Sequence, residues 1–524
     1  MKKTFIHSIF LFLVCISIPF QQLEAAERTI SLEDAILKTL ESNLGVKIQK
    51  EKVRQSEGAL QKASGTFDWT GTGTISRELQ KLPLTELQKR AAEAAAASSG
   101  GSVTDKLKGE DTALSIGVSK KSRTGITVSP TVSALDSYDN SSQYKSVNRS
   151  DVNVEIVIPL LRGLGVKNTG ANELAARSNL NTSELLSKHN ISKSVFSTAS
   201  AYWKCLAAGK NVEILEDSEK RSFEIFKLVE LLVQGGEIEP FLLNQARAKL
   251  LIRQSSLSDA RLELYKSKQA LAVAIGLTPQ ELSTAPRVEG TYPEVINPDV
   301  FETLARDKYI NEALRHRADY LSSKVDINTE EILLHKAEND IKPRLDFSFR
   351  VGYAGLDESS NAHRYYEGFS NNLTGGNVFG ALNLELPIEN NAARGEMLRR
   401  KALVKEKAFT AAELSNNIAS QVLVAMETLR RTIHEYNLSR KSTEDYRKAV
   451  IHENAKLKEN ETTLTSVIDI EDRYSEARVA ENNAMSKYIV ALAELRYVTG
   501  TVFEEDGKDE KVRFRLKSLM ELPF

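Results

Sequence analysis

The chain contains a stretch, residues 172–233, with almost no helix-breaking residues. It holds no proline and one glycine, Gly209. As a single helix, at about 1.5 Å rise per residue, it would be roughly 90 Å long. That is several times the length of a usual globular helix and is typical of a coiled coil or a helical stalk. The apolar residues Val195, Ala199 and Tyr202 are spaced by four and three, as a helix-packing face requires.

A second helical stretch follows the first after a short break. Residues 234–240 contain two glycines and Pro240, and residues 241–275 are again free of breakers up to Gly276. A long helix, a turn and a shorter return helix make a helical hairpin.

The same unit occurs twice. Residues 392–458 contain only Gly395 as a breaker, a polar break follows at 459–463, and residues 467–498 form a second run before Gly500. Apolar, strand-like residues ending in proline precede each hairpin, and Pro159 and Pro387 lie 228 positions apart. The spacing predicts an internal duplication.

The first residues have the composition of a targeting segment. Lys2 and Lys3 precede an apolar core at residues 5–20, and cleavage is predicted after Ala25; cleavage after Ala26 is less favoured, because it would place Glu24 where a small residue is preferred. A membrane-spanning helix is disfavoured because the core is short and contains His7. The predicted domains are a signal peptide (1–25), a first structural repeat (26–297), a second structural repeat (298–502) and a polar C-terminal tail (503–524).

Between the helical stretches, apolar and polar residues alternate, which is typical of strands with one apolar face. The alternating segments are 69–76, 114–119, 126–132, 152–158, 347–353 and 378–386. They fit a half-buried sheet in a soluble sandwich or a membrane barrel, and the signal peptide and the stalks favour the barrel.

The remaining segments connect these elements. Residues 81–110, 136–149 and 357–376 are predicted to be long loops. Residues 277–298 contain four prolines and indicate a linker. A helix is predicted to begin after Ser31 and to fade near Ala63, and another to cover residues 301–341.

The sequence offers little chemistry. The seven histidines are scattered, and Cys205 is the only cysteine that remains after export, so no intrachain disulfide can form. No metal site, no cofactor and no enzyme activity are predicted. The formal net charge of −1 argues against nucleic-acid binding.

The order of segments resembles the TolC family of outer-membrane efflux proteins, over about residues 30–502. The opening helix at 31–35 with Asn43, the strand-to-helix corner at 158–165 and its partner at 342–345 are similar in detail. The resemblance implies a mixed α and β, internally duplicated fold in a homotrimer, with helical hairpins forming a periplasmic α-barrel joined to a shared transmembrane β-barrel. The corner residues are Pro159, Gly163, Pro343 and Pro387.

In that family each chain gives four strands to a twelve-stranded barrel. This sequence has four strand candidates in its first half alone. The middle two, near Leu114 and Ile126, are interpreted as an extracellular hairpin or a strand extension.

The resemblance places function at the hairpin ends, which would dock a periplasmic adaptor protein. The end residues are Gly235, Gly236 and Pro240 in the first hairpin, and Asn460 and Thr463 in the second.

The second hairpin end also holds the predicted pore gate. Asp469 resembles the family's pore-facing aspartate, and Ser466 stands where a second aspartate is usual. Glu471 and Asp472 could compensate or could face outward. Alternatively, Asp469 is only the N-cap of the return helix.

These features predict the outer-membrane channel-tunnel of a tripartite efflux or type I secretion system in a Gram-negative-type bacterium. Its partners would be a periplasmic adaptor (membrane fusion) protein, an inner-membrane RND or ABC transporter and outer-membrane lipid. The alternative is a periplasmic coiled-coil adaptor or scaffold protein. The transported substrate is not encoded in this chain.

Overall fold

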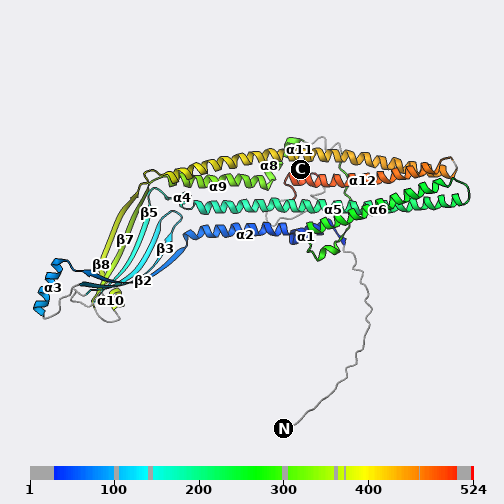
Figure 1. Ribbon diagram of the computed structural model, residues 1–524. Helices are drawn as coiled ribbons and strands as arrows, with labels where there is room; N and C mark the ends of the chain where they lie inside the picture. The colour runs from blue at the N-terminus through cyan, green and yellow to red at the C-terminus, as the bar shows by residue number, and fades with distance from the viewer. Residues whose placement is uncertain are drawn as a thin grey trace, which may run out of the picture. The chain divides into compact units, whose positions relative to one another are not determined.

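A computed structural model describes residues 29–99, 106–139, 146–297, 305–358, 364–370, 373–459, 461–503 and 521–523 (Figure 1). The predicted signal peptide and nearly all of the predicted tail lie outside these residues. The division into two sequence repeats stays a prediction.

The described chain contains helices and strands in a mixed order. The strands are β1 (Thr29–Ile30), β2 (Trp69–Pro83), β3 (Lys106–Lys121), β4 (Thr127–Asp139), β5 (Val147–Pro159), β6 (Arg287–Val288), β7 (Arg344–Asp357) and β8 (Leu373–Glu385). The α-helices are α1 (Leu32–Ser42), α2 (Leu44–Ser64), α3 (Glu86–Ser99), α4 (Val166–Thr169), α5 (Ala171–Gln234), α6 (Phe241–Ala274), α8 (Arg306–His316), α9 (Ala318–Asp340), α10 (Arg364–Ser370), α11 (Asn391–Lys458) and α12 (Leu464–Val498).

The chain forms two compact units. The hairpin unit comprises the residues up to Asn43, Val195–Ile296 and Arg431–Ala493, and its core includes Ile36, Leu271 and Tyr488. The sheet unit comprises Leu44–Ser194, Asn297–Arg430 and the residues from Glu494 onward, and its core includes Tyr309, Ile418 and Leu495.

The four long helices confirm the two predicted helical hairpins. The helix α5 has 64 residues and α11 has 68, and α6 and α12 are the shorter return helices. Packing follows the predicted spacing, since Val195, Ala199 and Tyr202 are almost completely buried. Helices of this length are stabilised mainly by such packing.

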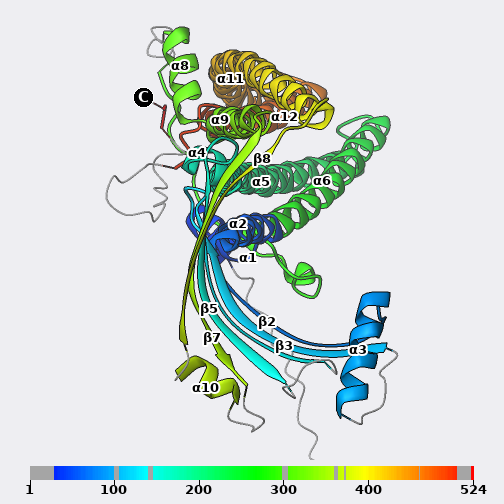
Figure 2. The ribbon, with the colours of Figure 1, turned by 90° about the vertical axis from the view of Figure 1, so that its left-hand side faces the viewer.

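All six predicted strand segments belong to one sheet in the sheet unit. Its order is β2-β3-β4-β5-β7-β8, every neighbouring pair is antiparallel, and the strands curve together (Figure 2). Pro130, which lacks an N–H, lies where the β3–β4 ladder is interrupted between Gly117↔Thr131 and Lys120↔Val128.

The middle two strands, interpreted from the sequence as an extracellular hairpin or a strand extension, are paired on both sides within this sheet. Strands β3 and β4 have 16 and 13 residues and lie inside the sheet between β2 and β5. The β2–β3 register runs from Trp69↔Lys120 to Pro83↔Lys106, the whole length of β2. The alternating pattern marked these strands, but only their pairing shows that they are integral members.

Two predicted loops contain helices. In segment 81–110, β2 continues to Pro83, β3 begins at Lys106, and α3 lies between them because the run from Ala94 to Ala97 has high helix propensity. In segment 357–376, α10 lies against β5 and β7 before β8 begins. In segment 136–149, β4 reaches Asp139 and β5 begins at Val147, which leaves residues 140–146 as a connection, and 140–145 of it lie outside the described chain.

The predicted opening helix is two helices, because a tertiary contact breaks it at Asn43. The backbone of Asn43 is extended (φ −61°, ψ 126°), and its Nδ2 donates to the carbonyl of Ala274 at 2.8 Å. Gly276, at φ +78°, lies against this break, and a Cβ there would come within 2.7 Å of the Asn43 backbone.

The helix predicted for residues 301–341 is broken in the same way at Arg317. Gly500, at φ +73°, packs on that break, and a Cβ there would lie 2.9 Å from the Arg317 nitrogen. The buried Arg317 guanidinium donates to Asp319 and Gln421, at 2.6 Å each.

The predicted proline-rich linker contains a short 3-10 helix (Glu281–Thr284) and the strand β6, which pairs in parallel with β1.

Candidate functional site: sheet faces, corners and hairpin ends

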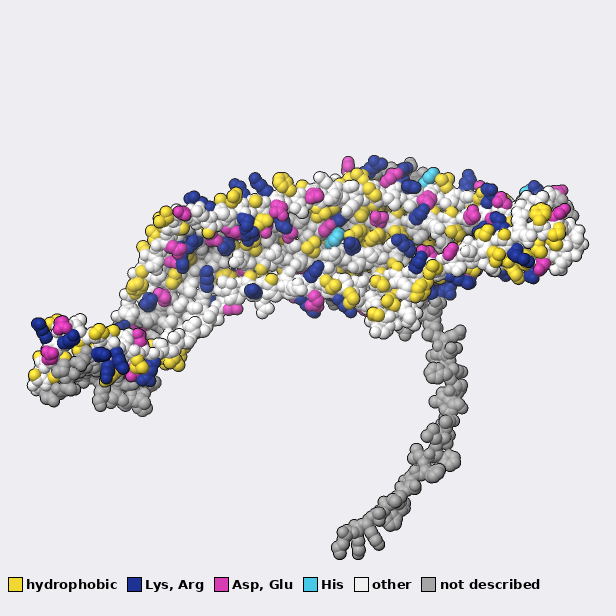
Figure 3. Space-filling view, in the orientation of Figure 1, with side chains coloured by type: hydrophobic (Ala, Val, Ile, Leu, Met, Phe, Trp, Pro, Cys, Tyr) yellow, Lys and Arg dark blue, Asp and Glu magenta, His cyan; other side chains and the backbone are white. Residues whose placement is uncertain are grey.

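One face of the six-stranded sheet is apolar and exposed over the part nearest the helices, up to Ile75 of β2, and beyond it the same face carries Arg77, Glu110 and Asp136. A register row crosses all six strands through Gly73, Ile116, Val132, Val152, Tyr353 and Gly376. Ile116 is 59% exposed and Tyr353 57%, and Val378 in a neighbouring row is 75% exposed. Figure 3 shows hydrophobic side chains along the margin of the sheet. A continuous exposed apolar surface of this kind marks a site of interaction with apolar surroundings.

The opposite face of the sheet is polar. The adjacent row contains Thr72, Gly117, Thr131, Asn153, Gly352 and Asn377. Arg350 of β7 forms an ion pair with Glu155 of β5 at 2.9 Å on this face. The two faces of the sheet therefore differ in polarity.

The predicted corner residues lie where strands and helices meet. Pro159 is the last residue of β5 and pairs with Asp346, Pro343 immediately precedes β7, and Pro387 follows the end of β8 by two residues. The Gly163 N–H donates to Asn339 Oδ1 at 2.8 Å, which joins this corner to the end of α9.

The turn between β3 and β4 is attached to the corner that follows β5. The Gly165 N–H donates to the Thr124 carbonyl at 2.9 Å, and a Cβ on Gly125 would lie 2.5 Å from the Gly163 carbonyl oxygen. Sequence reasoning missed this attachment, although a Ser-Arg-Thr-Gly turn between two alternating segments is itself a hairpin signal.

A bidentate ion pair strengthens the attachment. Arg123 in the turn donates to both carboxylate oxygens of Glu173, in the first turn of α5, at 2.7 Å each. Ser64 donates to the same carboxylate at 2.8 Å, and the guanidinium lies 5.0 Å from the centre of the Phe67 ring. The hydrogen bonds from Arg123 lower the pKa of Glu173 from its ordinary value of 4.5 to about 2.

The first hairpin end is closed by backbone hydrogen bonds. The helix α5 ends at Gln234, Gly236 has φ +73°, and the Glu237 N–H donates to the Leu232 carbonyl at 2.9 Å, as in a Schellman motif. Gly235 follows α5 directly, and Pro240 immediately precedes α6.

The second hairpin end is capped by Thr463. The helix α12 begins at Leu464, and the Ser466 N–H donates to Thr463 Oγ1 at 3.3 Å. The alternative prediction that Asp469 is the N-cap is therefore wrong, because Asp469 lies more than one turn inside the helix. Asn460 lies outside the described residues.

The three acidic gate candidates have different surroundings. Asp469 pairs only with its own-helix neighbour Arg473 among the contacts described, at 2.9 Å, and its side chain is 60% exposed. Glu471 binds Arg221 of α5 at 2.8 Å, and Asp472 binds Lys249 and Arg253 of α6 at 2.6 Å and 2.5 Å. Glu471 and Asp472 thus hold the return helix to the first hairpin, and Asp469 is the most exposed of the three.

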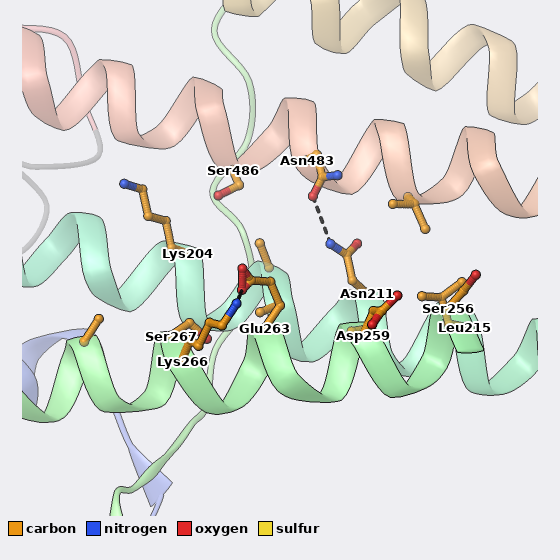
Figure 4. Close-up of a pocket in the computed structure, with 15 residues that line it drawn as sticks. Lys204, Asn211, Leu215, Ser256, Asp259, Glu263, Lys266, Ser267, Asn483 and Ser486 are labelled. Carbon is orange, nitrogen blue, oxygen red and sulfur yellow. Dashed lines mark hydrogen bonds and ion pairs between the residues drawn. The ribbon is translucent and has the colours of Figure 1, made fainter. Parts of the chain in front are cut away.

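A groove of about 650 Å³ lies between α5, α6 and α12 in the hairpin unit (Figure 4). Asn211 on α5 donates to Asn483 on α12 at 2.9 Å, and Ala207 and Ala260 are among the small residues that line it. Charged side chains also line the groove, among them Lys204, Asp259 and the ion-paired Glu263 and Lys266.

Among the described residues, no cluster of three or more His, Cys, Asp or Glu side chains is placed to hold a metal ion. None of the described helices is both long enough and apolar enough to cross a membrane.

Comparison with known proteins gives matches in structure alone. No family model and no curated protein matches the chain. The Campylobacter jejuni CmeC outer membrane channel matches with a TM-score of 0.64 and 15% identity, over 91% of this chain and 87% of that one. The Neisseria gonorrhoeae MtrE outer membrane channel matches with a TM-score of 0.60 and 13% identity, over 90% and 88%. CusC, a transmembrane channel, matches with a TM-score of 0.62 and 13% identity, over 90% and 92%.

The chain has the fold of these channels. The expected mixed α and β fold with long helical hairpins is thereby confirmed for the single chain. Nearly the whole channel fold is present, since the match covers about nine-tenths of each chain.

Proposed function

We propose that the chain forms the outer-membrane channel-tunnel of a tripartite efflux or type I secretion system. The observation that carries the proposal is a sheet with one exposed apolar face and one polar face, in a chain with the fold of outer membrane channels. Placing the sheet in lipid is favourable only if the backbone N–H and C=O groups of its edge strands are hydrogen-bonded. The sheet therefore requires partner strands.

The partner strands come from further copies of the chain in a homotrimer. The three sheets close into one transmembrane β-barrel with the apolar face toward lipid, and the hairpins form a periplasmic α-barrel. At the hairpin ends, Gly235, Gly236, Pro240, Asn460 and Thr463 meet a periplasmic adaptor fed by an inner-membrane RND or ABC transporter. The protein has no enzymatic role.

The gate is assigned to Asp469, which is exposed and paired only within its own helix in the described contacts. Three copies of this carboxylate around a narrow opening form a ring that favours cations.

Membrane fractionation followed by planar-bilayer recording tests the function. The expected result is a detergent-resistant trimer in the outer membrane that opens ion-conducting pores. A water-soluble elongated oligomer would instead support the periplasmic adaptor or scaffold.

A further inference from the structure

We propose that β3 and β4 are full strands of the channel wall, so that a trimer closes with eighteen strands and not twelve. The inference rests on the proposed trimeric channel and concerns the width of its membrane pore. The contact it assigns is between the edge strand β2 of one copy and the edge strand β8 of the next.

The first argument is that β3 and β4 share the two faces of the other strands. Ile116 and Val132 pair in register on the apolar face, and Val132 pairs onward with Val152 of β5. On the polar face, Gly117 pairs with Thr131, which pairs with Asn153. A hairpin outside the membrane would not need its apolar residues to lie beside the apolar residues of β5 and its polar residues beside the polar ones.

The second argument is where the β3–β4 turn lies. Through Thr124 and Arg123 it is fixed to Gly165 and to Glu173, at the start of α5. The turn is therefore at the helical end of the sheet, beside Pro159, so β3 and β4 cross the same distance as β5. An extracellular extension would place its turn at the opposite end.

The third argument concerns the sheet edges. Six alternating strands leave β2 and β8 running in opposite directions, so β8 of one copy meets β2 of the next in the antiparallel sense used throughout the sheet. Every residue of β2 is exposed, and Val378 and Leu382 of β8 are 75% and 66% exposed. Neighbouring copies of the chain pair with the backbone groups of both edge strands and extend both the apolar and the polar face of the sheet.

The consequence is a wider pore. Barrel diameter grows roughly linearly with strand number, so six strands per chain in place of four widen a trimeric wall about 1.5-fold. Such a pore admits bulkier solutes on the outer side than a twelve-stranded wall does.

Electron microscopy of the full-length protein in lipid nanodiscs counts the strands directly. Eighteen strands around a threefold axis is the expected result. A twelve-stranded wall with β3 and β4 outside it would overturn the inference and leave the channel proposal intact. If no closed trimeric ring forms, both fail.

Single-cysteine labelling in liposomes provides a second test that needs no deletion. In a Cys205→Ala background, Ile116→Cys and Ser115→Cys place a fluorophore on opposite faces of β3. Lipid-borne nitroxide should quench the label at position 116 severalfold more than at 115, and a water-soluble thiol reagent should react faster at 115. The matched pair Val132→Cys and Thr131→Cys should repeat this contrast on β4. Equal quenching within both pairs would show that β3 and β4 stand outside the lipid.

Discussion

Gly276 and Gly500 each combine a left-handed backbone with a contact too close for a side chain. Replacing Gly276 with alanine should destabilise the fold by about 1–3 kcal/mol, because the new Cβ strains φ and clashes with the Asn43 backbone. Thermal loss of helical circular dichroism measures the effect.

The matched control is Gly395→Ala. Gly395 lies within α11, and a Cβ there has open space. Helix propensity then favours alanine by roughly 0.5–1 kcal/mol, so this variant should melt at the same temperature or higher. Equal losses in the two variants would refute the contact at Asn43.

The pair formed by Glu173 and Arg123 makes stability depend on pH. Because the pKa of Glu173 falls from 4.5 to about 2 on folding, its stabilising effect is complete above pH 4.5 and is lost as the pH falls toward 2. Glu173→Gln should be less stable at pH 7 and should lose less stability over that acidic range. Melting curves between pH 7 and pH 3 measure this difference, and parallel profiles of the two proteins would contradict it.

Asp469 offers a functional prediction at the same scale. An exposed ion pair such as that with Arg473 contributes little, so in the proposed channel the Asp469 carboxylate would stay available to ions. Asp469→Asn should weaken cation selectivity and block by multivalent cations in planar bilayers, with the trimer intact.

Glu57→Gln is the control, since it removes the same charge from an exposed position on α2. Unchanged currents in Asp469→Asn would remove this residue from the gate. Asp472 would then be a poor substitute, because it already binds Lys249 and Arg253.

Among elements, the corner after β8 is predicted to affect trimer assembly more than the connection between β2 and β3 does. Pro387 cannot donate a ladder hydrogen bond, so it helps to end the strand before α11. Pro387→Leu should lower the yield of trimer on native gels more than Lys89→Ala, which removes only an exposed ion pair in α3. Equal yields would count against the role of Pro387 as a strand boundary.

The elements also show what the sequence can predict. The long helices and all six strand segments follow from the absence of breakers and from alternation, which are local properties. The helix breaks at Asn43 and Arg317 could not be predicted, because they depend on glycines more than 180 residues away in sequence. The place of β3 and β4 depends likewise on the docking of Thr124 at Gly165.

For the site, the sequence identified residues but not their contacts. The exposure of Asp469 and the pairing of Glu471 and Asp472 depend on which face of α12 meets α5 and α6. The sequence alone therefore cannot decide which of these acids face outward and which bind basic residues of the first hairpin.

At the scale of the whole molecule, the assembly is predicted to be a hollow trimer. The helix α11 alone, at 68 residues and about 1.5 Å per residue, is roughly 100 Å long. Electron microscopy together with the measured mass should show three copies around a tunnel. A monomer, or a particle much shorter than about 100 Å, would contradict the prediction.

The helix breaks at Asn43 and Arg317, each packed against a distant glycine, bear on how such a chain can evolve. Gly276 closes on Asn43 within the hairpin unit, and Gly500 closes on Arg317 within the sheet unit. The segment from β2 to β4 takes part in neither of these two glycine contacts. An insertion between β2 and β5 can therefore add a strand pair to the sheet while both of these contacts persist, so the sheet can widen without any change to the helices.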